Sequence, residues 1–307
     1  MPSQGPTIAL TGATGFVGQC LLEQALAAGY AVRALARREQ APRPGVTWVA
    51  GDLADRAALA ELLRGAEAVV HVAGVTNAPD AAGFEAGNVT GTLNLIEAAV
   101  AGGVHRFVFV SSLSAREPQL SAYGASKAKA EKLLKASTLG WTIVRPPAIY
   151  GPRDKEMMEL FRAAKWGLVP VPAQGNASMI HVEDLARLLV ALVPPADAVL
   201  GRTFEPDDAT PGGWPHVEMA RAIGRAMGRR VKVLGLSRKA LDRVAGLDRF
   251  FRGTKAKMTA DRAAYFSHPD WVVSPDKAVP AHLWQPRVDT REGLRATADW
   301  YRTAGWL

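Results

Sequence analysis

Three side chains near the middle of the chain have the types and spacing for proton transfer to or from an alcohol. Ser112 follows an apolar run, and Tyr123 and Lys127 stand four residues apart in Tyr-Gly-Ala-Ser-Lys. Residues four apart share one face of a helix. A phenol with a pKa of about 10 is a poor base at neutral pH, but a nearby ammonium favours the phenolate. We predict that Tyr123 carries the proton, Lys127 lowers its pKa and Ser112 orients the substrate oxygen.

A glycine-rich run near the amino terminus supports this prediction, since a Tyr-x-x-x-Lys pair alone also arises by chance. The run from Thr11 to Gly18 lies between a short apolar stretch and an apolar helical pattern. In a strand–turn–helix unit such glycines permit a tight turn, a close approach to pyrophosphate and close helix packing. The helix N-terminus adds free N–H groups and a positive dipole. Instead of an ordinary glycine turn, we predict a dinucleotide site that includes Gly12, Thr14, Gly15, Phe16, Val17 and Gly18.

The end of the second expected strand indicates which dinucleotide binds. An NAD site needs a carboxylate there for the ribose 2′-hydroxyl. This chain has Ala36 followed by Arg37 and Arg38. A guanidinium binds a 2′-phosphate in bidentate fashion and stacks on adenine. We therefore predict NADP(H) over NAD(H); in the alternative, both arginines are solvated loop charges.

Strand and helix signals alternate through the first half of the chain, which brings these motifs to one edge of a sheet. Strands that alternate with helices pair in parallel through right-handed crossovers. We predict an α/β fold, a doubly wound Rossmann-type parallel sheet with a smaller C-terminal substrate lobe. The expected strands are residues 7–10, 31–36, 47–50, 68–73, 106–110 and 141–145, and the expected helices are residues 19–28, 56–63, 91–100 and 125–136.

The pattern loosens after Gly151-Pro152, where prolines and tryptophans become more frequent. We predict an NADP-binding Rossmann domain over residues 1–165 and a substrate-binding lobe over residues 166–307. A return of the chain to the sheet is expected near residues 203–205, so the two parts are interleaved.

Several motifs together make the chain resemble the extended short-chain dehydrogenase/reductase family over nearly its whole length. The matching segments are residues 12–18, 52–53, 71–74, 88–92, 145–152 and 181–186, with the trio Ser112, Tyr123 and Lys127. The resemblance implies further cofactor contacts: Asp52 and Leu53 at the adenine ring, Ala73, Gly74 and Asn88 along the cofactor, Lys127 at the nicotinamide ribose, and Pro146 and Ile149 near the nicotinamide.

Two alanines bear on the substrate. Family members that act on nucleotide-diphosphate sugars usually carry Asn where this chain has Ala148 and Arg where it has Ala177. Neither alanine supplies a charge or a side-chain hydrogen bond to a diphosphate. The chain is more similar to the branch of 3β-hydroxysteroid dehydrogenases and dihydroflavonol reductases. This resemblance implies an NADP(H)-dependent oxidoreductase that interconverts a secondary alcohol and a ketone on a largely apolar steroid-, flavonoid- or terpenoid-like molecule.

Two other functions stay open. One is a nucleotide-sugar epimerase or dehydratase, which Ala148 and Ala177 disfavour. The other is a non-catalytic NADPH-binding subunit, similar to the accessory subunit of this family in respiratory complex I. Such subunits tend to lose the tyrosine or the lysine, and this chain keeps both Tyr123 and Lys127.

Length and composition set outer bounds. The chain has 307 residues, enough for one large α/β core and a smaller lobe, and no run of 18 apolar residues that would suggest a membrane span. Cys20 is its only cysteine, which excludes an intramolecular disulfide and a cysteine cluster for zinc, so no metal is expected. Without a charged and then apolar leader, we expect a cytoplasmic protein.

Positive charge is concentrated in residues 225–262, which hold 12 Lys or Arg against 3 Asp or Glu in a chain of net charge +8. Within them, residues 236–252 have near-helical spacing of apolar and basic side chains. Such a helix can lie on an anionic membrane surface, or pack its apolar face and leave a solvated basic rim. No nucleic-acid partner is expected, because the aromatic residues do not form a stacking platform. The apolar positions are Leu236, Ala240, Leu241, Val244, Leu247, Phe250 and Phe251, and the basic ones Arg238, Lys239, Arg243, Arg249 and Arg252.

The helical patterns over Phe84 to Val100 and Tyr123 to Ser137 are also candidates for an interface. The resemblance implies that such helices form a two-fold four-helix contact. We therefore expect a homodimer, although the same apolar positions could serve the sheet alone.

Overall fold

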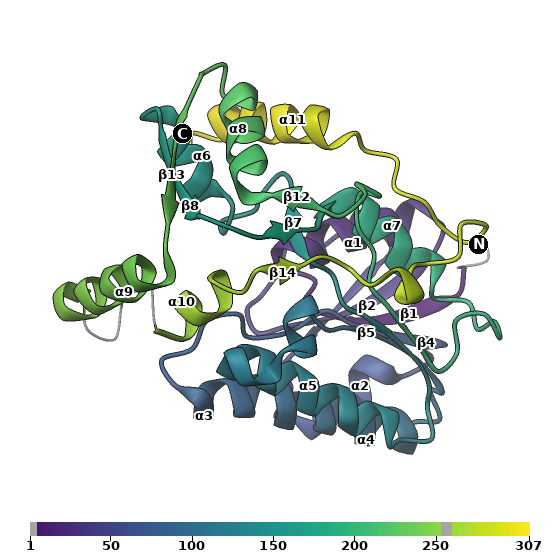
Figure 1. Ribbon diagram of the computed structural model, residues 1–307. Coiled ribbons are helices and arrows are strands. Elements are labelled where there is room, and N and C mark those ends of the chain that lie inside the picture. The colour runs from purple at the N-terminus through teal and green to yellow at the C-terminus, as the bar shows by residue number, and fades with distance from the viewer. Residues whose placement is uncertain (1–4, 253–259) are drawn as a thin grey trace. The chain divides into compact units, whose positions relative to one another are not determined.

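A seven-stranded parallel sheet organises the amino-terminal half of the protein, to which residues 202–204 add one strand, in the computed structural model (Figure 1). Its strand order is β11-β6-β5-β4-β1-β2-β3, which reverses direction between β1 and β4. This is the doubly wound Rossmann-type α/β fold, as predicted. The strands are β1 (Thr7–Thr11), β2 (Ala31–Ala36), β3 (Val46–Ala50), β4 (Ala68–His71), β5 (Arg106–Val110), β6 (Gly140–Val144) and β11 (Arg202–Phe204).

The structure describes residues 5–252 and 260–307. The side chains of residues 244–245, 247–249, 251–252 and 260–262 also lie outside this description. They include five positions of the basic segment: Val244, Leu247, Arg249, Phe251 and Arg252.

The helices of this half cover both faces of the sheet (Figure 1). The face under α2, α4 and α5 holds a core in which Leu59, Leu95 and Leu134 pack against Phe107 and Phe109. The helices α1 and α7 lie on the other face (Figure 1). The helical elements are α1 (Phe16–Ala27), α2 (Arg56–Leu63), α3 (Ala81–Phe84), the π-helix η1 (Glu85–Thr90), α4 (Gly91–Ala101), the 3-10 turns η2 (Leu113–Arg116) and η3 (Pro118–Leu120), α5 (Ala122–Lys135) and α7 (Val182–Ala191).

All the strands and helices expected in this half are present, and no boundary differs by more than three residues. The reason is visible in their burial. Every residue of β4 and β5 is buried, because central parallel strands are covered on both faces and read as continuous apolar runs. At the helix starts, Asp55 and Ser121 cap α2 and α5 by accepting hydrogen bonds from Ala58 N and Gly124 N.

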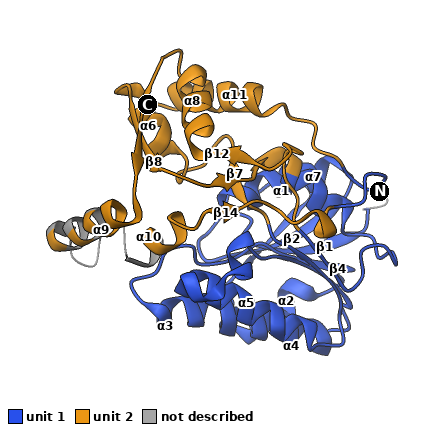
Figure 2. Ribbon diagram, in the orientation of Figure 1, with its two compact units in different colours: residues 1–145, 185–204, 279–284 blue, residues 146–184, 205–278, 285–307 orange. Residues whose placement is uncertain are grey.

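The chain divides into two compact units (Figure 2). The first contains residues 1–145, 185–204 and 279–284, and the second contains the rest. The boundary thus falls at Arg145, not at residue 165, and the segment that returns to the first unit starts at Leu185. Part of the reason is Arg106, a buried side chain of β5 that donates hydrogen bonds to the carbonyls of Leu192 and Val193. The expected return near residues 203–205 corresponds to β11, which pairs in parallel with β6.

The second unit combines short strands with helices around its own apolar core. Phe161 and Tyr301 meet edge to face with their ring centroids 5.2 Å apart, and Ile223 and Leu294 are fully buried near them. The elements are β7 (Ala148–Tyr150), α6 (Met158–Lys165), β8 (Leu168–Pro172), β9 (Asn176–Ala177), β10 (Met179–His181), β12 (Trp214–Pro215), α8 (His216–Ala226), β13 (Lys232–Leu236), α9 (Arg238–Arg252), α10 (Ala260–Phe266), β14 (Asp270–Trp271), the 3-10 turn η5 (Pro275–Lys277) and α11 (Thr290–Thr303).

The expected basic helix corresponds to α9, with one difference. Leu236 ends the strand β13, and the helix begins at Arg238. In the parts of the chain that are described, no helix combines the length and the hydropathy needed to cross a bilayer.

Candidate functional site

The site builds on the point where the strand order reverses. The strands β1 and β4 are direct neighbours, with Thr11 opposite His71 at their carboxyl ends. Open α/β sheets bind ligands in the crevice outside the carboxyl ends of the strands at such a switch point. The glycine turn follows β1, and Ala73 and Gly74 follow β4, so the sheet places two predicted cofactor segments side by side.

The glycine turn has the geometry that a pyrophosphate requires. Gly12 has a φ of 78°, and a Cβ there would lie 2.6 Å from Ala73 N. A Cβ at Gly18 would lie 1.9 Å from Gly12 O, so only glycine lets α1 approach the turn. Because a Cβ at either position would clash with backbone atoms, only glycines allow this tight turn, whose bare backbone fits a dinucleotide.

The first turn of α1 faces this cradle. Gly15 is its N-cap and forms no side-chain hydrogen bond to the helix. Phe16 and Val17 follow as the first helical residues, whose N–H groups have no intrahelical acceptor. Thr14 is exposed, and its carbonyl accepts a hydrogen bond from Gln19 Nε2 at 2.9 Å. The turn therefore presents N–H donors and the positive helix end to an anion.

The residues predicted for the adenosine end follow β2 and β3, the next two strands of the sheet after β1. Arg37 and Arg38 are exposed immediately after β2, the neighbour of β1. Asp52 follows β3, and its Oδ1 accepts a hydrogen bond from Ala54 N at 2.8 Å. Leu53 is held through its carbonyl, which accepts from Asn94 Nδ2 at 2.9 Å.

A buried hydrogen-bond chain fixes the ends of β1 and β4. Thr92 Oγ1 donates to Asn88 O at 2.6 Å, so it accepts from His71 Nε2 at 2.9 Å. His71 Nδ1 then accepts from Thr11 Oγ1 at 2.6 Å, and Thr11 Oγ1 accepts from Ala73 N at 3.2 Å. Burial, together with the charge of Lys127, lowers the pKa of His71 to about 3. The histidine is therefore neutral and positions the cofactor segment at Ala73.

Asn88 connects the loop after β4 to α5, the helix that carries the predicted catalytic residues Tyr123 and Lys127. It lies 2% exposed within the π-helix η1, a geometry often found at functional sites. Its Oδ1 accepts from Val75 N at 2.7 Å, and its Nδ2 donates to Val75 O and to Ser126 Oγ, each at 2.9 Å. Ser126 Oγ in turn donates to Tyr123 O at 2.7 Å. In this structure Asn88 thus holds the start of α5 in place.

Ser112 lies where β5 ends, as predicted, and a second serine orients it. Its Oγ accepts hydrogen bonds from Ser114 N at 3.2 Å and from Ser114 Oγ at 2.8 Å. A Cβ at Gly124 would lie 2.6 Å from Ser114 O, so the glycine after Tyr123 lets α5 pack closely on this turn. Sequence reasoning missed both Ser114 and Gly124, although each lies within two residues of a predicted catalytic residue.

Lys127 lies one helical turn after Tyr123 and is 3% exposed. Its Nζ donates to Val110 O at 2.8 Å and lies 4.4 Å from the centroid of the Phe109 ring. A Cβ at Gly74 would lie 3.6 Å from Nζ, so the ammonium reaches the cofactor segment after β4. Burial lowers the pKa of Lys127 to about 7, although the charge of Glu131 opposes this shift.

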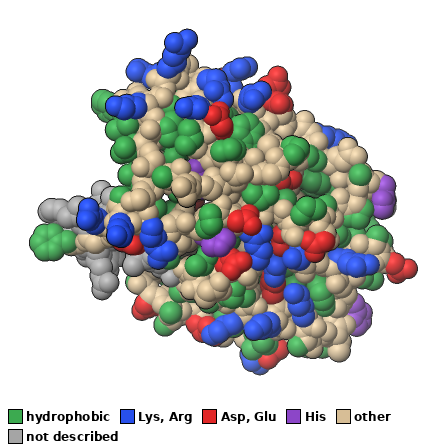
Figure 3. All heavy atoms as spheres, in the orientation of Figure 1, with side chains coloured by type: hydrophobic (Ala, Val, Ile, Leu, Met, Phe, Trp, Pro, Cys, Tyr) green, Lys and Arg blue, Asp and Glu red, His purple; other side chains and the backbone are tan. Residues whose placement is uncertain are grey.

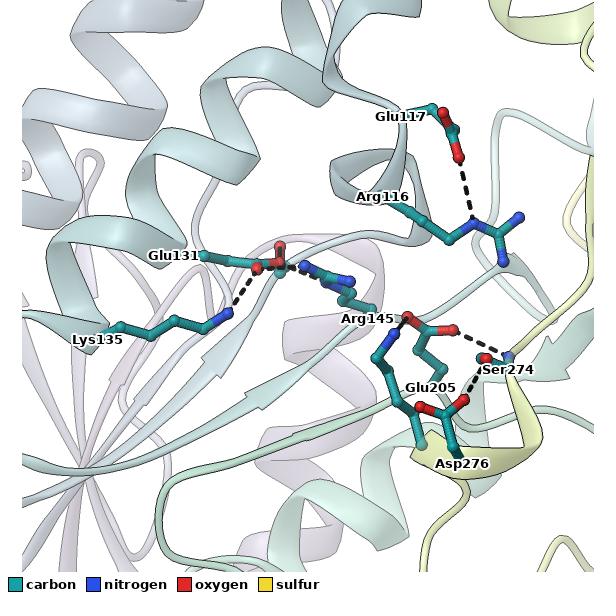
Figure 4. A network of polar contacts seen from close by, with 10 residues as sticks. Arg116, Glu117, Glu131, Lys135, Arg145, Glu205, Ser274 and Asp276 are labelled. Atoms are coloured by element: carbon teal, nitrogen blue, oxygen red, sulfur yellow. Dashed lines mark hydrogen bonds and ion pairs between the residues drawn. The ribbon is translucent and has the colours of Figure 1, made fainter.

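Glu131, one turn further along α5, forms an ion pair that sequence reasoning missed (Figure 4). It is 2% exposed and accepts from Arg145 Nε at 2.8 Å, from Arg145 Nη2 at 2.6 Å and from Ser111 Oγ at 2.6 Å. Burial alone would raise the pKa of Glu131, but the hydrogen bonds and charge of Arg145 lower it. The sequence signal that could have identified Glu131 is its position four residues after Lys127, on the same face of α5.

The remaining predicted residues belong to the second unit, beyond the boundary at Arg145. Pro146 is buried and Ile149 partly buried in the segment of β7. Ala148 pairs with Met179 in β10, and Ala177 pairs with Trp214 in β12.

The parallel sheet has a glycine turn suited to pyrophosphate at its switch point. After the neighbouring strand β5, the helix α5 carries Tyr123 and Lys127. This combination defines the class of nicotinamide-dependent α/β oxidoreductases. Comparisons with known proteins agree. Residues 12–194 match the family model described as NAD(P)H-binding. The ceramide reductase of Caulobacter vibrioides is 38% identical over 310 aligned residues, which cover 98% of this chain and 96% of that protein. The chain belongs to the extended short-chain dehydrogenase/reductase family.

Two further relatives and one solved structure extend the comparison. The 2-alkyl-3-oxoalkanoate reductase of Stenotrophomonas maltophilia is 28% identical over an alignment that covers 94% of this chain and 97% of that reductase. The UDP-glucose 4-epimerase of Vibrio cholerae is 30% identical over an alignment that covers 61% of this chain and 66% of the epimerase. The structure of MoeE5 with UDP-glucose and NAD covers 98% of this chain and 99% of its own, with a TM-score of 0.74 and 23% identity. This last likeness shows the fold alone.

Proposed function

We propose that the protein is an NADPH-dependent reductase that converts a ketone on a long-chain, ceramide-like lipid into a secondary alcohol. The observation that carries this proposal is the 38% identity to a ceramide reductase over nearly the whole of both chains. The 2-alkyl-3-oxoalkanoate reductase, which covers almost the full length too, is also named for an oxo compound with an alkyl chain. Both names favour a long-chain lipid over the steroid- or flavonoid-like molecules of the broader expectation.

The residues of this chain fit the proton half of that reaction. Bound NADPH supplies a hydride for the carbonyl carbon, and the C=O electron pair then moves to the oxygen. Tyr123 gives that oxygen its proton. Ser112 accepts both of its described hydrogen bonds from Ser114, which leaves its own hydroxyl proton for the substrate oxygen. Lys127 uses one ammonium proton on Val110 O and keeps two for the nicotinamide ribose and Tyr123.

An epimerase remains the main rival, because a UDP-glucose 4-epimerase matches part of the chain. That function would require groups that hold a sugar diphosphate. Ala148 and Ala177 stand where the resemblance places such groups, and a methyl group cannot bind phosphate. A reductase therefore fits this chain better.

The test is an assay of NADPH oxidation with purified protein. The substrates are an N-acyl sphingoid base oxidised to the ketone at its secondary carbinol carbon, a 2-alkyl-3-oxoalkanoate, a 3-ketosteroid and UDP-glucose. We expect turnover of the first, with the alcohol as product. Conversion of UDP-glucose to its epimer without reduction of any ketone would contradict the proposal.

Arg37 and Arg38 should decide the cofactor preference. In the protein with both Arg37→Ala and Arg38→Ala, the preference for NADPH over NADH should fall by about 1.5–3 kcal/mol, the scale of a hydrogen bond to a charged group. The measurement is a fluorescence titration with each cofactor. Arg43→Ala, an exposed arginine between β2 and β3, is the matched control and should change nothing. A double variant with the unaltered preference would show that the arginines do not bind the 2′-phosphate.

We further propose a homodimer through the helices over residues 84–100 and 123–137. Val100, at the end of α4, is 46% exposed and offers an apolar side chain to such a contact. Light scattering at tens of micromolar should report a dimer, and Val100→Glu should produce monomers. Leu168→Glu, at an equally exposed residue of the second unit, should leave the dimer intact. A monomeric wild-type protein would contradict this expectation.

A further inference from the structure

The strands β8 and β13 form a parallel ribbon in the second unit, and its two faces differ. Val169 and Val171 point into the core and are buried. On the outer face Leu168 lies beside Lys232, and Leu234 lies beside Pro170. Leu168 and Leu234 are each nearly half exposed. The outer face therefore presents apolar side chains to solvent.

Trp166 extends this surface. It stands just after α6, two residues before Leu168, and is 86% exposed. Trp at a surface is enriched where one end of the ring meets an apolar phase and the other end meets water. Figure 3 shows hydrophobic side chains at the surface in the region of β8 and β13, next to Lys and Arg side chains.

The helix α9 follows β13 and has two contrasting sides. Leu241 is buried and packs against Leu236 and Ala263. At 3.6 residues per turn, Lys239, Arg243 and Phe250 lie on the side opposite Leu241. All three are exposed, and Phe250 is 81% exposed. Leu241 fits a packed apolar face, whereas Phe250 does not.

Two cations of this helix, Lys239 and Arg243, are available to a partner. Arg238 pairs with Asp242 at 3.5 Å, and in the described part of the chain neither Lys239 nor Arg243 has an ion-pair partner. Three further cations precede them in the exposed stretch that leads into β13: Arg229, Arg230 and Lys232. Cations beside exposed aromatic and aliphatic side chains are typical of surfaces that bind anionic lipid.

We propose that the outer face of the β8–β13 ribbon and the Lys239–Arg243–Phe250 side of α9 together bind the surface of an anionic lipid bilayer. The cations contact lipid phosphates, while Phe250 and Trp166 enter the acyl boundary. Nucleic acid fits less well, because base stacking needs aromatic rings spaced along a basic groove. Docking would bring the protein to a lipid substrate where that substrate resides.

The test is sedimentation of the full-length protein, without NADPH or substrate, with vesicles of phosphatidylcholine alone or mixed with phosphatidylglycerol. We expect binding to the mixed vesicles only, weakening as salt rises, because the charge attraction fades within about 8 Å in physiological salt. Lys239→Glu with Arg243→Glu should lower the partition coefficient at least about 25-fold, about fivefold for each lost cation. Arg64→Glu with Arg202→Glu, exposed arginines of the first unit, is the control of equal charge change.

A separate substitution, Phe250→Ser, tests the apolar part of the proposed surface. Phe250→Ser should lower the partition coefficient about tenfold, and should remove the binding that persists in the wild-type protein at high salt, since salt does not screen apolar insertion. Three outcomes would overturn the proposal: no sedimentation with anionic vesicles at low salt, equal losses in the control double variant, or displacement of the protein from vesicles by equimolar duplex DNA.

The proposal can be separated from the proposed function, because vesicle binding is measured without catalysis. If the protein also reduces lipid ketones, the Lys239→Glu/Arg243→Glu variant should keep the wild-type kcat/KM on a water-soluble short-chain ketone. On a ketone embedded in anionic vesicles it should lose activity in proportion to the lost binding. Equal activity of this variant on both forms, despite weaker sedimentation, would exclude a role of docking in substrate access.

Discussion

Tyr123→Phe should lower kcat by about a hundredfold or more and leave NADPH binding unchanged. The substitution removes the proposed proton donor to the substrate oxygen, and general acid catalysis contributes about 10²–10⁴ to the rate. It keeps the ring, which lies 6.0 Å from the ring of Phe84 between centroids, so the start of α5 should stay in place. Steady-state kinetics on a confirmed substrate and a fluorescence titration with NADPH measure the two quantities.

Tyr30→Phe is the matched control, because it removes a phenol of the same unit that lies far along the chain from the catalytic trio. It should leave both kcat and NADPH affinity at wild-type values. Near-normal turnover by Tyr123→Phe would remove Tyr123 from the mechanism. A wild-type protein that binds NADPH and reduces nothing would support a non-catalytic accessory subunit instead.

Glu131→Gln should lower the free energy of unfolding by about 3–5 kcal/mol, the usual cost of removing one partner from a buried ion pair. Glu131 is 2% exposed, and glutamine keeps its shape. The substitution replaces a carboxylate with a neutral amide and so removes the ion pair with the guanidinium of Arg145, whose side chain is only 13% exposed. Urea unfolding followed by circular dichroism measures the change.

A surface ion pair supplies the control. Lys129 lies 2.9 Å from Glu85, and both side chains are about half exposed. Glu85→Gln should therefore cost at most about 1 kcal/mol. A Glu131→Gln protein as stable as the wild type would show that the pair with Arg145 does not stabilise the fold.

The same pair sets a pH dependence with a definite sign. The pKa of Glu131 in the folded protein is depressed, so its stabilisation is present above the unfolded value of about 4.3 and is lost as pH falls through the lower folded value. The stability difference between wild type and Glu131→Gln should therefore shrink in acid. A constant difference down to the acid transition would assign the effect to packing instead.

Much of the first unit could be predicted from the sequence because its signals are local. A buried strand such as β5 is a continuous apolar run, and the glycine turn carries its own spacing. Ser112 could be identified because it follows such a strand, and Tyr123 because it stands four residues before Lys127 at the start of a helical pattern.

The residues that support them depend on contacts between distant segments. Arg145 pairs with Glu131 because β6 ends next to α5. Neither segment's own sequence indicates that the two lie side by side. The burial of Lys127 and the role of Asn88 likewise depend on how the loop after β4 meets α5. The boundary at Arg145 was missed because the tryptophans become frequent only from Trp166, although Pro146 and Pro147 follow Arg145 directly.

The pairing of β11 with β6 has a consequence for how the protein is made. The strand β6 ends at Val144, but its neighbour on the open side, β11, begins only at Arg202. On the ribosome, the sheet must wait for almost sixty further residues of nascent chain, many of them belonging to the other unit. During that interval β6 is an unpaired edge, the kind of surface on which chains aggregate. We therefore expect that fragments that stop before residue 204, which leave this edge of the sheet open, aggregate more readily than the full chain.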